Sequence, residues 1–199
     1  VEETLAKDMR AVAGIPSWVQ MYFEKLVQKR QQKVGVIFKN LELFIFGGVN
    51  YEPYRNKFEA LIGREIDSVE LYPASEGFFA FQDRQNKTGM LLQLDSGIFY
   101  EFIEADRFFD KNPKRITLNN VKLGVNYVII ISTNAGLWAY NIGDTVKFTS
   151  LFPFRVVVSG RIKHFISAFG EHVIAQEVDQ ALIQAVKGCL LYTSPSPRD

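Results

Sequence analysis

The segment 41–46 is the feature that most restricts the fold of this chain, because an apolar run rich in Phe and Ile is typical of a buried strand. It ends on Gly47 and Gly48, which indicate a tight turn. A helix is predicted over 50–62, since Asn50 can cap its first turn and apolar residues follow at helical spacing. A short strand at 68–72 comes next. The order strand, turn, helix, strand predicts a layered α/β domain.

From Gly77 onward the pattern changes to that of antiparallel hairpins, in which apolar segments are separated by turn residues. The strands that this pattern predicts are 78–82, 89–95, 98–105, 127–133, 137–140, 145–148 and 155–160. Apolar residues recur at helical spacing in three other segments, which are predicted as helices: 2–13, 17–32 and 172–187. The expected fold class is therefore mixed α/β.

Composition excludes several classes of function. The 23 Lys and Arg against 22 Asp and Glu give a net charge of +1, without the basic excess that a nucleic acid or an anionic membrane requires. Cys189 is the single cysteine, so no intrachain disulfide can form. The only histidines are His164 and His172, and together with Cys189 they do not have the spacing of zinc ligands. The apolar runs are too short to span a bilayer, so we expect a soluble, cytoplasmic protein.

Two glycine-containing strand ends are candidates for ligand contact. Gly47 and Gly48 lack a Cβ and let a flat ligand approach the backbone, although a plain strand-to-helix turn also explains them. The segment 71–77 places Tyr72, Ser75 and Glu76 within five residues. Tyr72 could stack a base, and Glu76 could hold Mg²⁺, which takes hard oxygen ligands together with substrate phosphates. An ordinary surface turn is the alternative.

Two further segments place a charged residue at a strand end. Gly143 and Asp144 interrupt two β runs, and the carboxylate of Asp144 can accept both hydroxyls of a ribose. An Asx turn in a hairpin is the alternative. Arg161 and Lys163 flank the point where the hairpins stop, and the Arg161 guanidinium suits a ribose hydroxyl or a phosphate. Solvated surface cations are the alternative there.

The order and spacing of these segments resemble the adenylate-forming superfamily, in which a Tyr-x-x-Ser/Thr-Glu turn precedes Gly-Asp and then Gly-Arg-x-Lys/Asp at a hinge. Three segments resemble one branch more specifically: Tyr-Pro-Ala-Ser-Glu-Gly-Phe-Phe at 72–79, Gly-Leu-Trp-Ala-Tyr-Asn-Ile-Gly-Asp at 136–144, and Gly-Glu at 170–171. That branch is the Gretchen Hagen family of auxin-responsive acyl-acid amido synthetases and their bacterial relatives. The segment 14–18 fits it too, so the resemblance covers about residues 10–187.

The resemblance implies roles for the matched positions. Nucleotide contacts are implied for Gly47, Gly48, Tyr72, Ser75, Asp144 and Arg161. Glu76 would hold Mg²⁺ and, with Arg161, take part in catalysis, while Lys163 matches the hinge. One departure is Asn141, which stands where the family has an arginine.

The resemblance also implies a partial adenylate-forming fold. Residues 1–160 would belong to the second half of the large N-terminal adenylation domain, and 161–188 to the hinge and the first helix of the C-terminal lid. The phosphate loop would lie upstream of Val1, so we expect the chain itself to be inactive. The segment 189–199 resembles a translated sequencing adapter and is predicted to be a disordered, non-native tail. A natural Ser/Pro-rich terminus is the alternative.

The implied function is ATP-dependent activation of a carboxylic acid as an acyl adenylate, followed by amide formation with an amine or amino acid. ATP, AMP and Mg²⁺ are the implied cofactors, and small molecules are the expected partners. An acyl-CoA ligase, which differs in its acceptor, is one alternative. A non-catalytic nucleotide- or acid-binding module is another, but binding adenosine alone would not need the carboxylates of both Glu76 and Asp144. The sequence does not indicate the acid, the acceptor or the oligomeric state.

Overall fold

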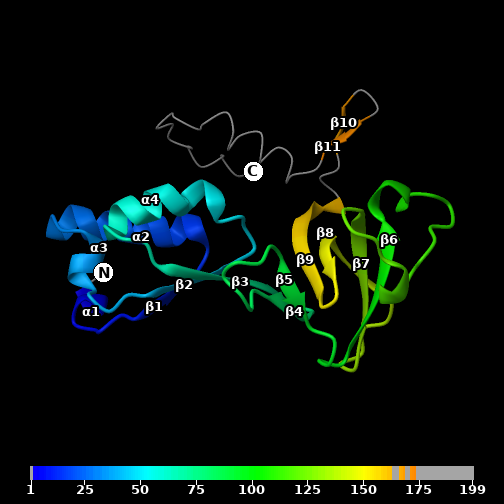
Figure 1. Ribbon diagram of the computed structural model, residues 1–199, viewed down its shortest axis with the longest axis horizontal. Helices are drawn as coiled ribbons and strands as arrows, with labels where there is room; N and C mark the ends of the chain where they lie inside the picture. The colour runs from blue at the N-terminus through cyan, green and yellow to red at the C-terminus, as the bar shows by residue number, and fades with distance from the viewer. Residues whose placement is uncertain (1, 163–165, 169–170, 174–199) are drawn as a thin grey trace.

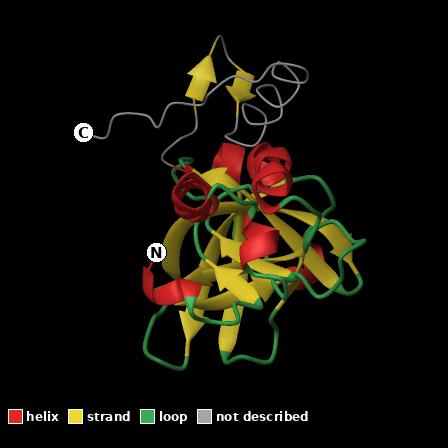
Figure 2. Cartoon of the chain, turned by 90° about the vertical axis from the view of Figure 1, so that its left-hand side faces the viewer, coloured by secondary structure: helices red, strands yellow, loops and turns green. Residues whose placement is uncertain are grey.

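The computed structural model describes residues 2–162, 166–168 and 171–173. A nine-stranded sheet runs through this part of the chain in the order β1-β2-β3-β4-β5-β9-β8-β7-β6. Helices cover one end of the sheet, and the strands of the other end curl into a separate lobe (Figure 1). Figure 2 shows the same curling from the helical end.

The elements have the following bounds. The strands of the main sheet are β1 (Ala11–Ala13), β2 (Leu43–Gly47), β3 (Asp67–Ala74), β4 (Gly77–Phe81), β5 (Met90–Leu92), β6 (Ile98–Glu104), β7 (Asn126–Thr133), β8 (Tyr140–Leu151) and β9 (Phe154–Arg161). The α-helices are α1 (Glu2–Leu5), α2 (Pro16–Arg30), α3 (Val34–Ile37) and α4 (Glu52–Ile62), and two 3₁₀ turns are η1 (Ala105–Arg107) and η2 (Leu118–Asn120). A separate pair consists of β10 (Ile166–Ala168) and β11 (Glu171–Val173).

The helical lobe is built on β1, β2 and β3, which are parallel to one another. Its core is aromatic: the Phe58 ring of α4 lies 4.9 Å from the Phe44 ring of β2 and 5.5 Å from the Phe23 ring of α2. All three side chains are fully buried. Because parallel strands end at the same edge, Gly47 and Ala74 lie at the edge that faces the second lobe.

The second lobe is antiparallel and encloses its own core. Phe102 of β6 lies at the centre of this core, with ring centroids 5.2 Å from Phe148 and 6.0 Å from Tyr127. Alternate residues of β7 point inward, which places Tyr127 and Ile129 in this core and Val128 on the other face. The strand predicted at 127–133 is thus confirmed, and both of its faces are buried.

Several predicted elements differ from the structure. The helix predicted over 2–13 is wrong beyond Leu5, because residues 11–13 pair with β2 as a parallel strand, and strand pairing overrides helical spacing. The strand predicted at 137–140 is wrong for residues 137–139, which belong to the loop before β8, and the strand predicted at 145–148 is part of the longer β8, which begins at Tyr140. The helix α4 begins at Glu52, two residues after the predicted start at Asn50. The Asn50 side-chain oxygen accepts a hydrogen bond from the backbone N–H of Glu52 at 3.1 Å.

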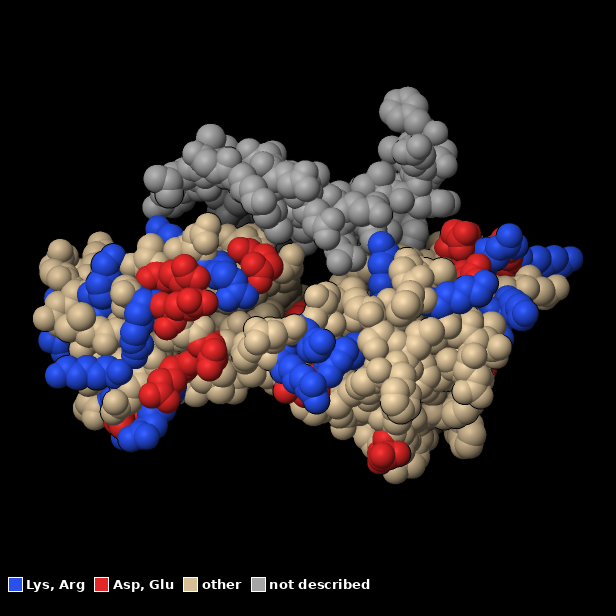
Figure 3. Space-filling view, viewed as in Figure 1, with Lys and Arg blue, Asp and Glu red and all other residues tan. Residues whose placement is uncertain are grey.

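Two other predictions fall largely outside the described residues. Of the helix predicted over 172–187, the first two residues belong to β11, which excludes a helix at that point, and the rest is not described. The tail 189–199 also lies outside the described residues. Within the described part, no helix is both long and apolar enough to cross a membrane. Basic and acidic side chains are interspersed on the face seen in Figure 3.

Glu70 on β3 provides a pH-dependent test of the fold. Burial raises the pKa of its carboxyl above the ordinary 4.5, and the nearby charge of Glu52 adds to that rise. The carboxyl of Glu70 has a higher pKa in the folded state than in the unfolded state, so its ionisation favours unfolding. The free energy of unfolding therefore falls as the pH rises from the unfolded-state pKa to the folded-state pKa. We expect Glu70→Gln to raise Tm by about 2–4 °C at pH 7 and hardly at all at pH 3.5, measured by circular dichroism. Glu65→Gln, at an exposed site, is the control; a gain independent of pH would contradict the interpretation.

Candidate functional site

The β3–β4 hairpin brings one part of the candidate site together. Tyr72 lies near the end of β3, and Ala74 pairs with Gly77 of β4, so Ser75 and Glu76 form a two-residue connection. The pairing shifts in register between Tyr72 and Pro73. Ser75 is exposed and Glu76 partly exposed at the tip, whereas Tyr72 is 5% exposed.

An irregularity of β8 places Asp144. Val128 of β7 pairs with Thr145, but Ile130 pairs with Asn141, so residues 142–144 lie opposite the single residue Ile129. Such a bulge bends the strand and redirects its side chains. Gly143 has φ +83° within it, a value that glycine adopts without a Cβ clash. The predicted turn between two strands at this position is therefore wrong: Gly143 and Asp144 form a bulge inside one strand.

Tyr72, Asp144 and Arg161 form one cluster, which we call the 72–144–161 cluster. The Tyr72 hydroxyl donates a hydrogen bond to Asp144 Oδ2 at 2.9 Å. The Arg161 Nε lies 3.0 Å from Asp144 Oδ1. Asp144 also pairs with Arg161 across β8 and β9, so the backbone supports the ion pair. Tyr72 and Asp144, which are 72 positions apart in the sequence, thus meet Arg161 at one carboxylate.

Burial differs sharply across the cluster. The Asp144 side chain is 12% exposed and that of Arg161 is 68% exposed, so the guanidinium covers the carboxylate from the solvent side. Burial raises the pKa of the Tyr72 phenol, and the Asp144 charge and hydrogen bond raise it further. Tyr72 therefore remains a protonated donor over the physiological pH range. A carboxylate has about four lone-pair positions, so Asp144 keeps capacity to accept ligand hydroxyls.

The Tyr72 ring does not lie as the sequence suggested. It packs edge-on against Phe79 at a centroid distance of 5.1 Å and belongs to the core of the second lobe. A ring that is 5% exposed has no open face on which a base could stack. Tyr72 contributes to the site only through its hydroxyl, which donates a hydrogen bond to Asp144.

Glu76 lies four residues beyond Tyr72 but makes no hydrogen bond or ion pair with the cluster in the described part of the chain. Among these residues no group of three His, Cys, Asp or Glu side chains is placed to hold a metal ion. Glu76 could therefore supply one carboxylate ligand at most. Lys163, predicted as the hinge, lies outside the described residues.

Gly47 and Gly48 differ in what they allow. A Cβ at Gly47 would lie 2.5 Å from the backbone oxygen of Leu71, so the close approach of β2 to β3 requires glycine there. Gly48 has open space around it but a φ of +77°. The structure thus gives Gly47 a packing role, and leaves Gly48 at the edge that faces the second lobe.

We expect Gly47→Ala to lower the free energy of unfolding by about 1–3 kcal/mol, because the strand pair must separate to admit a methyl group. Gly48→Ala should cost about 1 kcal/mol, since only the left-handed backbone is strained. Urea denaturation of the two variants measures both values. If Gly48→Ala proved the more damaging, the close contact with Leu71 would not be the controlling feature.

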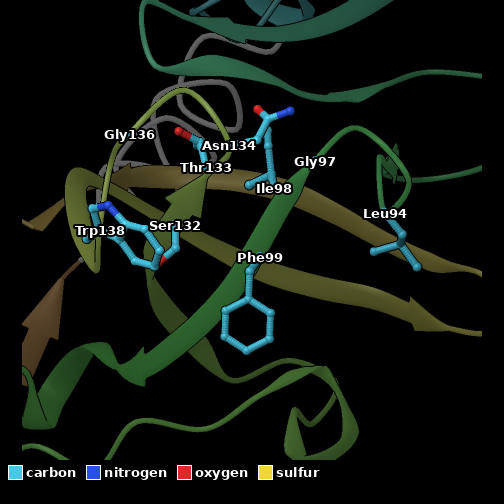
Figure 4. Close-up of a pocket in the computed structure, with 9 residues that line it drawn as sticks. All are labelled: Leu94, Gly97, Ile98, Phe99, Ser132, Thr133, Asn134, Gly136 and Trp138. Carbon is cyan, nitrogen blue, oxygen red and sulfur yellow. The ribbon is translucent and has the colours of Figure 1, made fainter.

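An open pocket of about 480 Å³ lies where β6 begins and β7 ends, beside the loop that leads from β7 to β8. Phe99 and Trp138 border it, and Ile98 forms part of its wall (Figure 4). A Cβ built on Gly77 would lie 3.0 Å from Ile98 Cδ1, so the pocket wall touches the β3–β4 hairpin. This pocket was not predicted from the sequence.

Sequence reasoning also missed three polar side chains behind the cluster. Thr145 and Ser159 are 1% and 2% exposed, and Asn126 bonds to Ser159. Each looks like an ordinary strand residue in the sequence. Only the pairing of β7, β8 and β9 brings them together.

Comparisons with known proteins identify the fold. Residues 91–161, about a third of the chain, match the family model of the GH3 family central domain. The structure matches the acyl acid amido synthetase GH3.15 with a TM-score of 0.66 at 14% identity, covering 92% of this chain and 42% of that one. It matches 2-hydroxyisobutyryl-CoA ligase in the postadenylation state with a TM-score of 0.64 at 16% identity, covering 92% and 39%. MatB from Rhodopseudomonas palustris matches with a TM-score of 0.54 at 15% identity, covering 88% and 35%.

These matches confirm the predicted fold class, a mixed α/β chain with part of the fold of adenylate-forming enzymes. The resemblance to the Gretchen Hagen family is confirmed over residues 91–161, which match the family model of the GH3 central domain. The chain spans about two fifths of the length of the first two structures. At 14–16% identity, these structural matches show a shared fold and no more.

Proposed function

We propose that this chain is the adenylate-binding part of a GH3-type ligase that activates a carboxylic acid with ATP and joins it to an amine or amino acid. The observation that carries the proposal is the 72–144–161 cluster. A nearly buried carboxylate is held there by a phenol on one side and a solvent-exposed guanidinium on the other. Asp144 and Arg161 both lie in the segment that matches the GH3 central domain.

The domain assignment is part of the proposal. Residues 1–160 correspond to part of the large adenylation domain, and 161–188 to the hinge and the beginning of a lid. The two lobes of the described structure both lie in the first of these. The strand β3, which begins in the helical lobe, brings Tyr72 into the core of the second lobe, where it meets Asp144 of β8. Lys163 remains the proposed hinge residue.

Each site residue has a proposed task. Asp144 accepts the two ribose hydroxyls of ATP with its free lone pairs, and Tyr72 holds that carboxylate in place. Arg161, exposed and ion-paired, can turn from Asp144 toward the ribose or a phosphate. Gly48 and Gly47 line the edge of the parallel strands, and Ser75 donates its hydroxyl to a phosphate at the hairpin tip.

The chemistry requires charge neutralisation more than a reactive side chain. An oxygen of the substrate carboxylate attacks the α-phosphate of ATP, an acyl–phosphate bond forms, and pyrophosphate leaves. Glu76 would serve as one carboxylate ligand of Mg²⁺ beside substrate phosphates, because Mg²⁺ commonly binds in that way. When bound there, Mg²⁺ would neutralise phosphate charge. The amine then attacks the acyl carbonyl and releases AMP.

A second candidate is an acyl-CoA ligase, in which a thiol replaces the amine as acceptor. The match to 2-hydroxyisobutyryl-CoA ligase, with a TM-score close to that of the amido synthetase, favours keeping it. The two candidates share the adenylation step and differ only in the acceptor. A non-catalytic binding module is the third candidate.

Pyrophosphate exchange tests the proposal. A longer gene product that includes this sequence should exchange radiolabelled pyrophosphate into ATP in the presence of an acid from a panel of aromatic and aliphatic acids. Added amino acids or coenzyme A should then yield an amide or a thioester, which separates the first two candidates. We expect the 199-residue chain alone to bind AMP without exchange. Exchange by neither protein with any acid, together with no AMP binding, would refute the adenylation assignment.

A further inference from the structure

Two bulges lie side by side where the cluster is built. On β8, residues 142–144 lie opposite the single residue Ile129 of β7. On β9, Val158 pairs with Val146 and Gly160 pairs with Thr145, so Ser159 is an extra residue without a partner on β8. The next pair along is Asp144 and Arg161. The geometry of the cluster therefore depends on two consecutive irregularities in strand pairing.

A buried chain of hydrogen bonds crosses the three strands at this point. The Ser159 hydroxyl donates to Asn126 Oδ1 of β7 and lies 3.0 Å from the Thr145 hydroxyl of β8. A hydroxyl has one proton, and a carbonyl oxygen only accepts. With the Ser159 proton given to Asn126, the Thr145 hydroxyl donates to Ser159 Oγ. The bulged residue of β9 is thus bonded to the adjacent strand β8 and to β7, the next strand beyond it.

We propose that Ser159, with Thr145 and Asn126, is a positioning residue that holds the paired bulges so that Asp144 and Arg161 face the nucleotide. None of the three touches the ligand in this view. They act through the backbone, because Thr145 follows Asp144 directly and Ser159 precedes Arg161 by two residues. A bulge re-aims the side chains next to it, so loosening this one would turn Asp144 away from Tyr72. The proposal rests on the proposed nucleotide site.

The chain contains a matched control on the same strand. Register also shifts between Phe148 and Ser150, which leaves Thr149 as an extra residue of β8. The Thr149 hydroxyl donates to the backbone oxygen of Thr88 at 3.0 Å. Thr145→Val and Thr149→Val therefore make the same chemical change, at bulges of one strand, beside the cluster and away from it.

The first arm of the experiment measures AMP affinity of the 199-residue chain by isothermal titration calorimetry. We expect Thr145→Val and Ser159→Ala each to weaken AMP binding about tenfold, because a displaced Asp144 would lose the equivalent of one hydrogen bond to the ribose. Thr145→Ser keeps the hydroxyl and should bind AMP like the unaltered chain. Thr149→Val should leave AMP affinity unchanged. An equal loss in Thr149→Val, or no loss in the other two, would overturn the proposal.

The second arm needs no ligand. The Arg161 Nε–H resonance, followed in ¹⁵N-edited NMR spectra, reports the ion pair with Asp144. It should move in Thr145→Val and Ser159→Ala and stay in place in Thr149→Val and Thr145→Ser. An unaltered chain that fails to bind AMP would count against the proposed function, while this resonance would still decide the positioning role. If Ser159→Ala does not fold, Thr145→Val decides alone, and an unmoved resonance in it would overturn the proposal.

Discussion

Replacement of Asp144 by alanine is expected to weaken AMP binding by at least about 100-fold. Asp144 is the one residue that both Tyr72 and Arg161 contact in the cluster. Each hydrogen bond to a charged group contributes about 1.5–3 kcal/mol, so losing two ribose contacts corresponds to a factor of 100 or more. The variant should also be less stable by about 1–3 kcal/mol, because the buried Tyr72 hydroxyl loses its acceptor. Titration calorimetry and urea denaturation measure the two effects.

Asp83 provides the control for this variant. It forms a two-pronged ion pair with Arg155, whose second bond, from Nη2 to Asp83 Oδ2, is 2.8 Å long. Asp83→Asn should therefore lower stability while leaving AMP affinity unchanged. Asp144→Asn keeps an acceptor for Tyr72 without the charge, and should recover stability more than affinity. Wild-type AMP affinity in Asp144→Ala would contradict the site assignment.

Phe102→Ala is expected to lower the free energy of unfolding by about 3–5 kcal/mol, the cost of emptying a large aromatic site in a packed core. Phe102 is fully buried, and its ring contacts those of Phe148, Tyr127 and Tyr100. These three rings belong to β6, β7 and β8, so a cavity at Phe102 weakens the packing of all three strands of the second lobe. Urea denaturation followed by tyrosine and tryptophan fluorescence measures the loss.

Phe99→Ala is the matched control, because Phe99 lies on the same strand but is 57% exposed. We expect a change of less than about 0.5 kcal/mol from it, as for most surface positions. Comparable losses in the two variants would mean that the core of the second lobe is not centred on Phe102.

Local pattern was sufficient for the elements whose burial repeats regularly. The helix α2 and the strands β2, β3, β6 and β7 lie close to their predicted positions, since each has one apolar face or an apolar run that only one kind of element can bury. The strand β1 was missed because a three-residue strand has too few positions to show a period. Its structure comes from pairing with β2, in which Ala11 lies opposite Leu43.

The same distinction between local pattern and long-range pairing applies to the candidate site. Residue types and spacing along the sequence by themselves determined the order strand, turn, helix, strand over 41–72, the change to antiparallel hairpins after Gly77, and the choice of Tyr72, Asp144 and Arg161 as candidates. Only tertiary structure decided how these three meet. The bulges at 142–144 and Ser159, the burial of the Tyr72 ring and the close contact of Gly47 with Leu71 all depend on cross-strand register. Register is set by partners far away in the sequence, and a shift of one residue reverses which face a side chain occupies, so no local pattern could have specified it.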